Sequence, residues 1–423
     1  MDPRKLLIGS FHAALAAADP LQIVGRHLPA PPRGRTVVVG AGKAAASMAV
    51  AVERAWPPEA PLEGVVITRY RHGLATKRIR VVEAGHPVPD ENGQAAAREI
   101  LELARGLGEE DLLLVLASGG GSSLLSLPAA GVAMDDLKQV TRGLLASGAP
   151  IQDMNTVRKH LSSIQGGRLA AATRARVLAL VISDVTGDDP THIASGPCAP
   201  DPTTYGDAHE ILERFGVELP AAIARHLERG ARGEIEETPK PGDAVFARVE
   251  NRVVATAHQS LLAAATFYQG HGVAPLVLGD SVTGESSEVA KVFGAFAREI
   301  RLHGHPSKPP LALISGGETT VTLRGRGRGG RCTEFLLSLA VDLAALDDTW
   351  AIACDTDGID GSEDNAGAIL APDSLARARA AGLEAKKMLA DNDGYGFFSA
   401  LDDLVVTGPT RTNVNDFRVI LLS

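Results

Sequence analysis

The sequence predicts an α/β fold, and three observations lead to this prediction. Short runs rich in Val, Ile and Leu alternate with segments of helical period rich in Ala, Leu and Arg, which is typical of parallel strands covered by helices on both faces. The loops after the apolar runs are rich in Gly, Ser, Asp and Thr, as at the ligand-binding edge of an open α/β sheet. The length of 423 residues, 45% of them hydrophobic, suits two domains.

The apolar runs locate the predicted strands. In the first half they are residues 36–40, 64–68, 79–85, 112–118 and 177–183, and in the second half 252–257, 274–279, 311–315, 350–354, 404–408 and 418–422. A polar, charged segment with prolines predicts a linker near residues 231–245. The predicted domains are therefore residues 1–235, built on a parallel sheet, and residues 246–423, a smaller α/β domain whose last segment could pack back on the first.

The composition narrows the class of partner. The net charge is -9, with acids and bases interspersed, which argues against nucleic acid or an anionic membrane as the main partner and favours a small molecule. Cys198, Cys332 and Cys354 are odd in number and far apart, so they indicate neither a disulfide framework nor a zinc site. No stretch approaches the roughly 18 apolar residues of a membrane span. We expect a cytoplasmic protein; its oligomeric state stays open, with a homodimer as one candidate.

The stretch "VVVGAGKAAASMA" at residues 37–49 is an apolar strand, a glycine turn and the start of a helix. Gly42 and its neighbours satisfy G-x-G-x-x-A, the pattern of a dinucleotide-binding turn. An NAD enzyme would carry an acid at the end of the next strand, whereas residues 68–71 are Thr-Arg-Tyr-Arg. An arginine there leaves NADP open. Lys43 instead suits a phosphate that is being transferred, although a solvated lysine is the plainer interpretation.

Two further glycine loops follow apolar strands. "SGGGSS" at residues 118–123 could bring backbone amides close to phosphate oxygens, and it is not a Walker loop. "ISGGETT" at residues 314–320 repeats the Ser-Gly-Gly order. One hypothesis is that the two are related phosphate loops facing one cleft, and chance similarity is the alternative. The candidate binding residues are Ser118, Gly119, Gly120, Gly121, Ser122, Gly316, Gly317 and Glu318.

Charged residues supply the remaining candidates. Arg158 and Lys159 fall on an expected helix that Asn155 could cap, and they suit a carboxylate or phosphate unless they only cover a solvated face. The loop after residue 183 carries acids that could hold Mg²⁺ or act as a base, with ordinary Asx turns as the alternative. These acids are Asp184, Asp188 and Asp189; Asp355, Asp357 and Arg331 occur in the second half.

Eight segments in order resemble a known family: "GAGKAAASMA", "SGGGSSLL", "MNTVRKHLSSIQGGRLA", "SDVTGDDPTHIASGP", "SGGETTVTLRGRGRGGRCTE", "DTDGIDG", "DNDGYGFF" and "TGPTRTNVND". In this order they are similar to the glycerate 2-kinases of the second glycerate kinase class, from about residue 5 to the C-terminus. The resemblance implies a Rossmann-like N-terminal domain, a smaller C-terminal α/β domain of the MOFRL type, and a cleft between them. There, ATP would phosphorylate the 2-hydroxyl of D-glycerate.

The resemblance matches Lys43 and Arg331 with the cleft lysine and arginine of the family, residues 118–122 with its glycine loop, and residues 184–189 and 355–357 with its acidic loops. In a phosphoryl transfer Lys43, Arg331, Asp184 and Asp188 would be catalytic, and Asp184 and Asp189 would hold Mg²⁺. The two glycine loops, together with Asn155, Arg158, Lys159, Asp355, Asp357 and Asn413, are the candidates for binding glycerate and ATP. Two alternatives stay open: an NAD(P)H-dependent hydroxypyruvate reductase that uses the G-x-G-x-x-A turn, and a non-catalytic sensor that binds the nucleotide without turnover.

Overall fold

The computed structural model describes residues 2–344 and 346–423; residues 1 and 345, which fall in the two predicted domains, lie outside that description. Contacts divide the chain into two units. The N-terminal unit is Pro20–Val254, and the C-terminal unit is Ala255–Ser423 together with the segment that ends at Asp19. The domain boundary predicted between residues 235 and 246 stays a prediction.

A six-stranded sheet organises the N-terminal unit, in the order β3-β2-β1-β4-β5-β6. The pairings β2·β3, β1·β2, β1·β4 and β4·β5 are parallel, which confirms the predicted parallel sheet of an α/β fold. This strand order is that of dinucleotide-binding α/β folds, and it reverses between β1 and β4. The strands are β1 (Thr36–Ala41), β2 (Leu62–Arg69), β3 (Ile79–Ala84), β4 (Leu112–Ala117), β5 (Arg176–Ile182) and β6 (Val249–Ala255).

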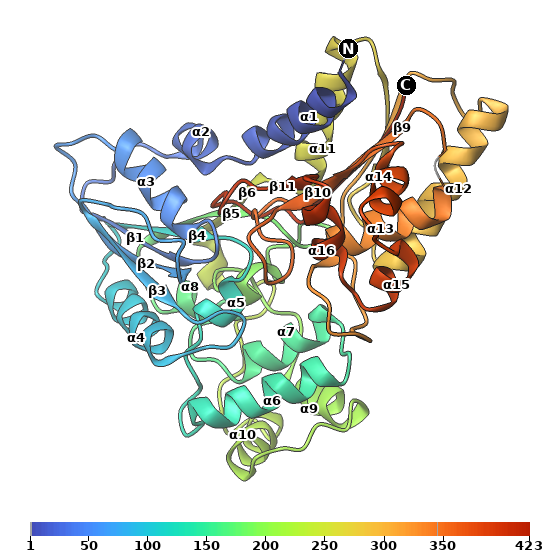
Figure 1. Cartoon of the computed structure of the whole chain (residues 1–423). Coiled ribbons are helices and arrows are strands. Elements are labelled where there is room, and N and C mark those ends of the chain that lie inside the picture. Colours follow the sequence, from blue (N-terminus) through green and yellow to red (C-terminus); the bar gives the residue numbers. More distant parts are fainter. Residues whose placement is uncertain (1, 345) are drawn as a thin grey trace. The chain divides into compact units, whose positions relative to one another are not determined.

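Helices cover both faces of this sheet (Figure 1), so every residue of β1 and β4 is buried. Helix α4 (Glu91–Arg105) begins where Asp90 accepts a hydrogen bond from the Gly93 amide, and its apolar stripe packs against one face. Helix α3 (Ala45–Ala55) lies on the other face. The remaining helices are α2 (Pro20–Ile23), η1 (Val24–His27), α5 (Gly121–Leu124), α6 (Met134–Ala146), α7 (Ile151–His160), α8 (Arg168–Ala171), η2 (Ile193–Ser195), α9 (Tyr205–Arg214), α10 (Ala221–Ala231) and η3 (Ala244–Arg248).

Helices α6, α7, α9 and α10 form a separate apolar cluster within this unit. Met154 and Val157 of α7 are buried in it beside Leu212 and Leu227. Because these apolar positions fix the rotation of α7, its polar positions Asn155 and Arg158 are held at a different angle around the helix axis.

The C-terminal unit contains a second six-stranded sheet, in the order β11-β10-β9-β12-β8-β7. The expectation of parallel strands is wrong here: among the pairings described for this sheet, β7·β8 alone is parallel, and β12 pairs antiparallel with both β8 and β9. The predicted strand 252–257 belongs to β6 of the first sheet, and β10 was not predicted. The strands are β7 (Ala274–Gly279), β8 (Leu311–Ser315), β9 (Thr349–Asp355), β10 (Gly367–Leu370), β11 (Leu404–Val405) and β12 (Asp416–Leu422).

Helix α13 (Arg331–Leu343) is the buried helix of this unit, and residues 332–340 all lie in the interior. Phe335 and Leu339 pack in the same core as Ile420 of β12. Helix α1 (Pro3–Ala17) packs on α11 (Ala257–Gly270) through a second core. The others are α12 (Ser286–His303), α14 (Ser374–Ala380), α15 (Ala385–Ala390) and α16 (Gly394–Ala400).

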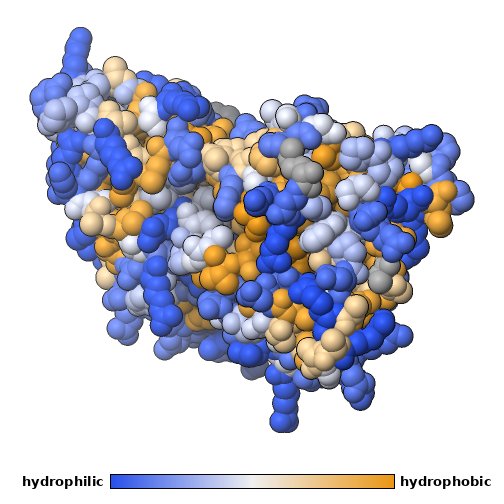
Figure 2. Space-filling view, turned by 45° about the horizontal axis from the view of Figure 1, so that its top comes forward, coloured by the Kyte–Doolittle hydropathy of each residue, from blue (hydrophilic) through white to orange (hydrophobic). Residues whose placement is uncertain are grey.

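The surface shown in Figure 2 mixes hydrophilic side chains with small hydrophobic patches. Isolated exposed apolar residues such as Leu302 and Leu323 are normal on a protein surface. Within the described residues, no single helix is long and apolar enough to cross a membrane; α1 taken together with α2 and η1 reaches that length only as a pair bent by 52°.

Candidate active site

The glycine turns after β1 and β4 lie side by side where the strand order of the first sheet reverses. The amide of Lys43 donates to the carbonyl of Gly119 at 2.8 Å, and the amide of Ala44 donates to Oγ of Ser118 at 3.1 Å. A Cβ atom at Gly42, whose φ is +146°, would lie 2.1 Å from that Oγ. Gly42 is therefore required by the close approach of the two turns. In open α/β sheets this crevice is where ligands bind.

Lys43 and His86 flank Gly120. A Cβ atom there would lie 2.9 Å from Nε2 of His86 and 3.4 Å from Cγ of Lys43, and the φ of Gly120 is +80°. Only glycine suits this backbone and this space. The structure thus brings together Lys43 and the predicted loop of residues 118–122, and adds His86. His86 was not predicted, because a single histidine before a proline carries no sequence signal of its own.

Three polar side chains form a bonded group beneath the loop. Oγ of Ser195 lies 2.9 Å from Oγ of Ser122 and 3.1 Å from Oδ1 of Asn155. Nδ2 of Asn155 donates to the carbonyl of His192. Asn155 lies inside α7, so the expectation that it caps a helix is wrong; Pro150 precedes that helix. Ser195 and Ala194 have φ values of 57° and 52°, a strained conformation that clusters at functional sites.

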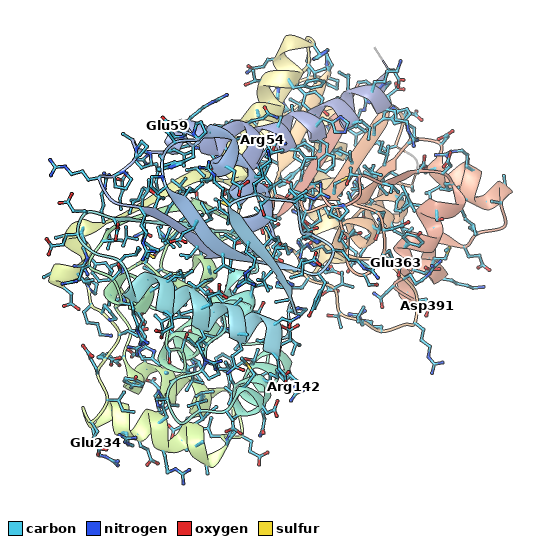
Figure 3. The ribbon with its side chains drawn as sticks, turned by 90° about the vertical axis from the view of Figure 1, so that its left-hand side faces the viewer. Arg54, Glu59, Arg142, Glu234, Glu363 and Asp391 are labelled. Atoms are coloured by element: carbon cyan, nitrogen blue, oxygen red, sulfur yellow. The ribbon has the colours of Figure 1, made fainter. Side chains whose placement is uncertain are left out.

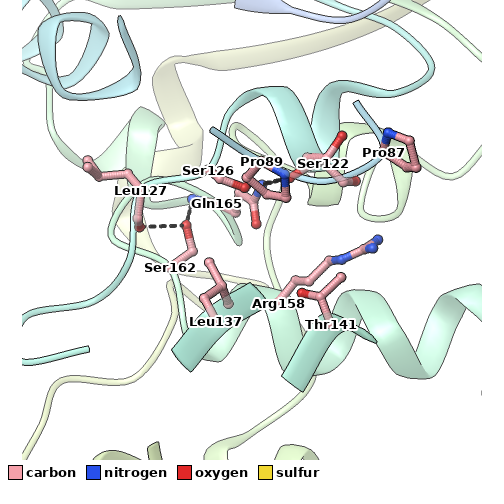
Figure 4. A pocket seen from close by; sticks show the side chains of 11 residues that line it. Pro87, Pro89, Ser122, Ser126, Leu127, Leu137, Thr141, Arg158, Ser162 and Gln165 are labelled. Carbon is pink, nitrogen blue, oxygen red and sulfur yellow. Dashed lines mark hydrogen bonds between the residues drawn. The ribbon is translucent and has the colours of Figure 1, made fainter. Parts of the chain in front are cut away.

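The two basic residues of α7 have different environments. Nη1 of Arg158 donates to Oδ1 of Asn155 at 3.2 Å, and Arg158 lines a small pocket with Ser122, Gln165 and Pro87 (Figure 4). Lys159 is 1% exposed and pairs with the buried carboxylate of Asp201 at 3.3 Å. The surroundings of Lys159 therefore fit a structural ion pair, whereas those of Arg158 leave it facing a pocket.

The acidic loop after β5 contains ordinary turns. Oδ1 of Asp189 accepts the amide of Thr191 at 2.9 Å, an Asx turn, and the backbone of Asp188 is left-handed with φ 56°. Asp184 is half-buried directly after the strand. Among the described residues, no group of three or more His, Cys, Asp or Glu side chains could hold a metal ion. A metal ion at this loop would therefore need further ligands from a bound substrate and from water.

In the C-terminal unit, Arg331 bonds to three carboxylates at the start of α13. Its Nε, Nη1 and Nη2 donate to Asp416, Glu318 and Asp355 at 2.6, 2.6 and 2.8 Å. Burial disfavours the charged guanidinium, but these carboxylates outweigh burial and raise its pKa well above the ordinary value. Arg331 is therefore fixed as a cation within an acidic group.

The other predicted residues of this unit lie in the turns after β8 and β9 or before β12. Gly317 has φ +98°, and its carbonyl accepts the amide of Asp416. The carbonyl of Gly316 accepts Nη1 of Arg418 at 2.9 Å. Asp357 and Asn413 are buried, and each accepts a backbone amide two residues on. The turn after β8 is thus anchored to β12.

Glu334, which was not predicted, lies one helical turn after Gly330 and lines a second pocket with Arg331 and Asn392. Burial raises the pKa of Glu334 to about 7, against a hydrogen bond from Nδ2 of Asn392. A carboxyl group with such a pKa exchanges a proton near neutrality. The sequence around Glu334 does not predict this raised pKa, because the burial of the side chain depends on residues near 392.

Residues 391–393 hold in place the glycine–arginine loop, which is the segment of residues 324–330 before α13. Oδ1 of Asn392 accepts the amides of Arg324 and Gly325, and the carboxylate of Asp391 accepts the amide of Arg326. Residues 324–330 form irregular backbone outside the helices and strands. Glu363, labelled with Asp391 in Figure 3, lies 3.6 Å from Arg328.

Comparisons with known proteins cover both units. Residues 6–228 match a family described as "Domain of unknown function (DUF4147)", and residues 311–416 match the MOFRL family. The chain is 51% identical to an Agrobacterium vitis protein provisionally named hydroxypyruvate reductase, over 99% of this chain and 94% of that protein. It is 38% identical to the glycerate 2-kinase of Pyrococcus horikoshii, over 100% of this chain and 98% of that protein. The crystal structure of a glycerate kinase from Thermotoga maritima matches it with a TM-score of 0.88 and 36% identity, over 100% of this chain and 99% of that one.

Proposed function

Because the chain belongs to the glycerate 2-kinase family, as its motifs predict, we propose that it transfers the γ-phosphoryl group of ATP to the 2-hydroxyl of D-glycerate. A bond forms between the 2-oxygen and phosphorus, and the bond from phosphorus to the bridging oxygen of ADP breaks. The hydroxyl proton leaves to a base. The products are 2-phosphoglycerate and ADP.

One observation carries the proposal: the two glycine turns of the first sheet meet at its switch point with Lys43 beside Gly120. Phosphoryl transfer depends mainly on alignment and on stabilising the charge that spreads over the equatorial oxygens. A lysine ammonium beside glycine backbone can meet those oxygens without displacing a side chain. In this proposal Lys43 is the cation that stabilises the transferred group.

Arg331 has a matching role in the C-terminal unit. Its partners Asp416 and Asp355 are buried, and the side chain of Glu318 is 53% exposed. A phosphate oxygen can replace Glu318 while the two buried carboxylates keep the guanidinium in place. Gly316, Gly317, Asp355, Asp357 and Asn413 would shape the nucleotide site around it.

The acidic loop after β5 fits Mg²⁺ carried by a nucleotide. Mg²⁺ in kinases takes one or two carboxylates and completes its shell with phosphate oxygens and water, so in this proposal Asp184 and Asp189 would be its protein ligands. When bound, the ion would neutralise charge on the phosphates. Asp184 or Asp188 would accept the hydroxyl proton.

An NADPH-dependent hydroxypyruvate reductase is the second candidate, and one feature favours it. Strand β2 ends at Arg69, which could meet a 2′-phosphate next to the G-x-G-x-x-A turn. An acid for the ribose of NAD does not follow that strand, since residues 70 and 71 are Tyr and Arg. The reductase would leave Arg331 and its acids without a role.

The test is a product assay by ³¹P and ¹³C NMR with purified protein, ATP, Mg²⁺ and D-glycerate, beside an NADPH oxidation assay with hydroxypyruvate. The expected result is 2-phosphoglycerate with no NADPH oxidation. Formation of 3-phosphoglycerate would overturn the regiochemistry. Hydride transfer without phosphorylation would overturn the kinase.

A further inference from the structure

We infer that Arg158, with Asn155, Ser122 and Ser195 around it, forms the subsite that binds the carboxylate of the acid substrate. The inference rests on the proposed function. It deepens that proposal by giving Arg158 the role of binding the acid substrate, while Lys43 stabilises the transferred phosphoryl group. No comparison assigns a role to these side chains.

The first argument is charge. In the described part of the chain the guanidinium of Arg158 meets a neutral amide, that of Asn155, and no carboxylate. Burial without a compensating anion lowers the pKa of Arg158 to about 10. Arg331, by contrast, meets three carboxylates. A half-buried cation that meets no carboxylate among the described residues is a strong receptor for an anion that arrives as a ligand.

The second argument is how the side chain is aimed. Oδ1 of Asn155 accepts from both Nη1 of Arg158 and Oγ of Ser195, and Asn155 is itself 1% exposed. The hydroxyl of Ser195 also reaches Ser122 of the glycine loop. In Figure 4 the Arg158 side chain extends from α7 toward Pro87 and Ser122. Asn155 and Ser195 therefore act as positioning residues that direct Arg158 to the glycine loop after β4, beside the turn that carries Lys43.

The third argument is size. The cavity beside Arg158 measures about 10 Å³, room for roughly one water molecule, and Leu127 and Leu137 line it with the polar groups. A nucleobase or a triphosphate is far larger. A single planar carboxylate group is much closer to this size, and it can take the two parallel hydrogen bonds of a guanidinium. The size of this cavity therefore favours the carboxylate of a small acid over a nucleotide.

The test separates binding of the acid from turnover. D-glycerate and glycerol, which lacks the carboxylate, are titrated by calorimetry into the wild type, Arg158→Gln, Arg158→Lys and Arg142→Gln, without nucleotide. Arg142 is an exposed arginine of α6 and serves as the matched control (Figure 3). We expect the wild type and Arg142→Gln to bind D-glycerate and not glycerol. Arg158→Gln should bind D-glycerate about 10- to 100-fold more weakly, the usual loss of a charge-assisted hydrogen bond, with Arg158→Lys in between.

Steady-state kinetics supply the second readout. In Arg158→Gln the KM for D-glycerate should rise with the KM for ATP unchanged, and circular dichroism should match the wild type. Unchanged glycerate affinity, or a rise confined to the KM for ATP, overturns the inference. The proposed function fails separately: if the wild type binds glycerate through Arg158 but forms no phosphoglycerate, the subsite stands and the kinase assignment does not.

Discussion

Nε of Arg331 donates a hydrogen bond to Oδ1 of Asp416 at 2.6 Å, and the other carboxylate oxygen of Asp416 bonds to the buried Arg418. Arg418 in turn donates to the carbonyl of Gly316. One carboxylate therefore joins the start of α13, strand β12 and the Ser-Gly-Gly turn. Since both arginines share it, the position of Arg331 depends on a residue with no place among the predicted site residues.

Asp416→Asn should destabilise the protein by about 3 to 5 kcal/mol, because it removes the charge that compensates a buried arginine. The measurement is the free energy of unfolding from urea titration. Asp373→Asn is the matched control, since Asp373 forms an exposed ion pair with Arg377 on the surface of the same unit. That change should cost less than about 1 kcal/mol. Equal effects of the two substitutions would show that Asp416 is not an energetic anchor.

Lys43→Ala should lower kcat by about 100- to 1000-fold, the usual effect of removing one charge-stabilising donor, with little change in thermal stability. A half-buried lysine in a turn contributes little to the core. Arg54→Gln, on the exposed side of the following helix, is the control for a lost surface cation (Figure 3). Measured kcat and melting temperature decide the matter; turnover at the wild-type rate in Lys43→Ala would remove this lysine from the reaction.

Glu334 predicts a pH dependence of stability. Its pKa is raised by burial to about 7 from an ordinary 4.5, so between these values the folded protein holds a proton that the unfolded chain has lost. The free energy of unfolding should therefore fall as pH rises from 4.5 to 7, by up to about 3 kcal/mol. Glu334→Gln cannot ionise and should lose this slope. Its stability relative to the wild type should be lowest near pH 4.5 and rise to a plateau above pH 7.

Urea titrations of both proteins at pH 4.5, 6, 7 and 8 measure this difference. A constant difference across the series would mean that Glu334 titrates at its ordinary pKa. Asp393→Asn, which removes a carboxylate from the neighbouring turn and leaves Glu334 in place, is the control substitution.

The first half of the fold could be predicted because its signals are local. Apolar runs that lead into glycine turns identified β1 and β4, and the meeting of their turns follows from the parallel order. The predicted strand at residues 252–257 was read correctly as a strand, yet periodicity does not say which sheet a strand joins, and β6 completes the first. Strand β10 was not predicted, because four residues are too few to show a hydrophobic periodicity.

The site was predictable only where a motif carries its own chemistry. Lys43 follows a glycine turn of a type that is typical of ligand-binding sites. Ser195, His86 and Glu334 look ordinary in the sequence, and what sets them apart appears only in the fold: Ser195 has a left-handed backbone, His86 approaches Gly120, and Glu334 is buried with a raised pKa. Pairings over such sequence separations are set by tertiary packing, which single-chain patterns do not encode.

The last prediction concerns Asn392, whose side chain links the glycine–arginine loop to α13. Oδ1 accepts two loop amides, and Nδ2 donates to Glu334. The backbone of Asn392 is left-handed with φ 56°, so an alanine there would add strain of its own, whereas Asn392→Gly removes the side chain without it. In Asn392→Gly the amides of Arg324 and Gly325 lose their acceptor.

Hydrogen exchange measured by mass spectrometry should then be at least about 10-fold faster in peptides covering residues 322–330, which corresponds to a loss of roughly 1.4 kcal/mol or more of protection. Exchange in peptides of α11 should be unchanged. If the loop opens to water in this variant, the pKa of Glu334 should fall, because solvation removes the burial that raises it.

Asn365→Gly, which removes a buried asparagine from another turn of the unit, controls for a general loss of stability. Exchange that rises equally across the whole unit in both variants would mean that Asn392 supports the fold at large and not this loop.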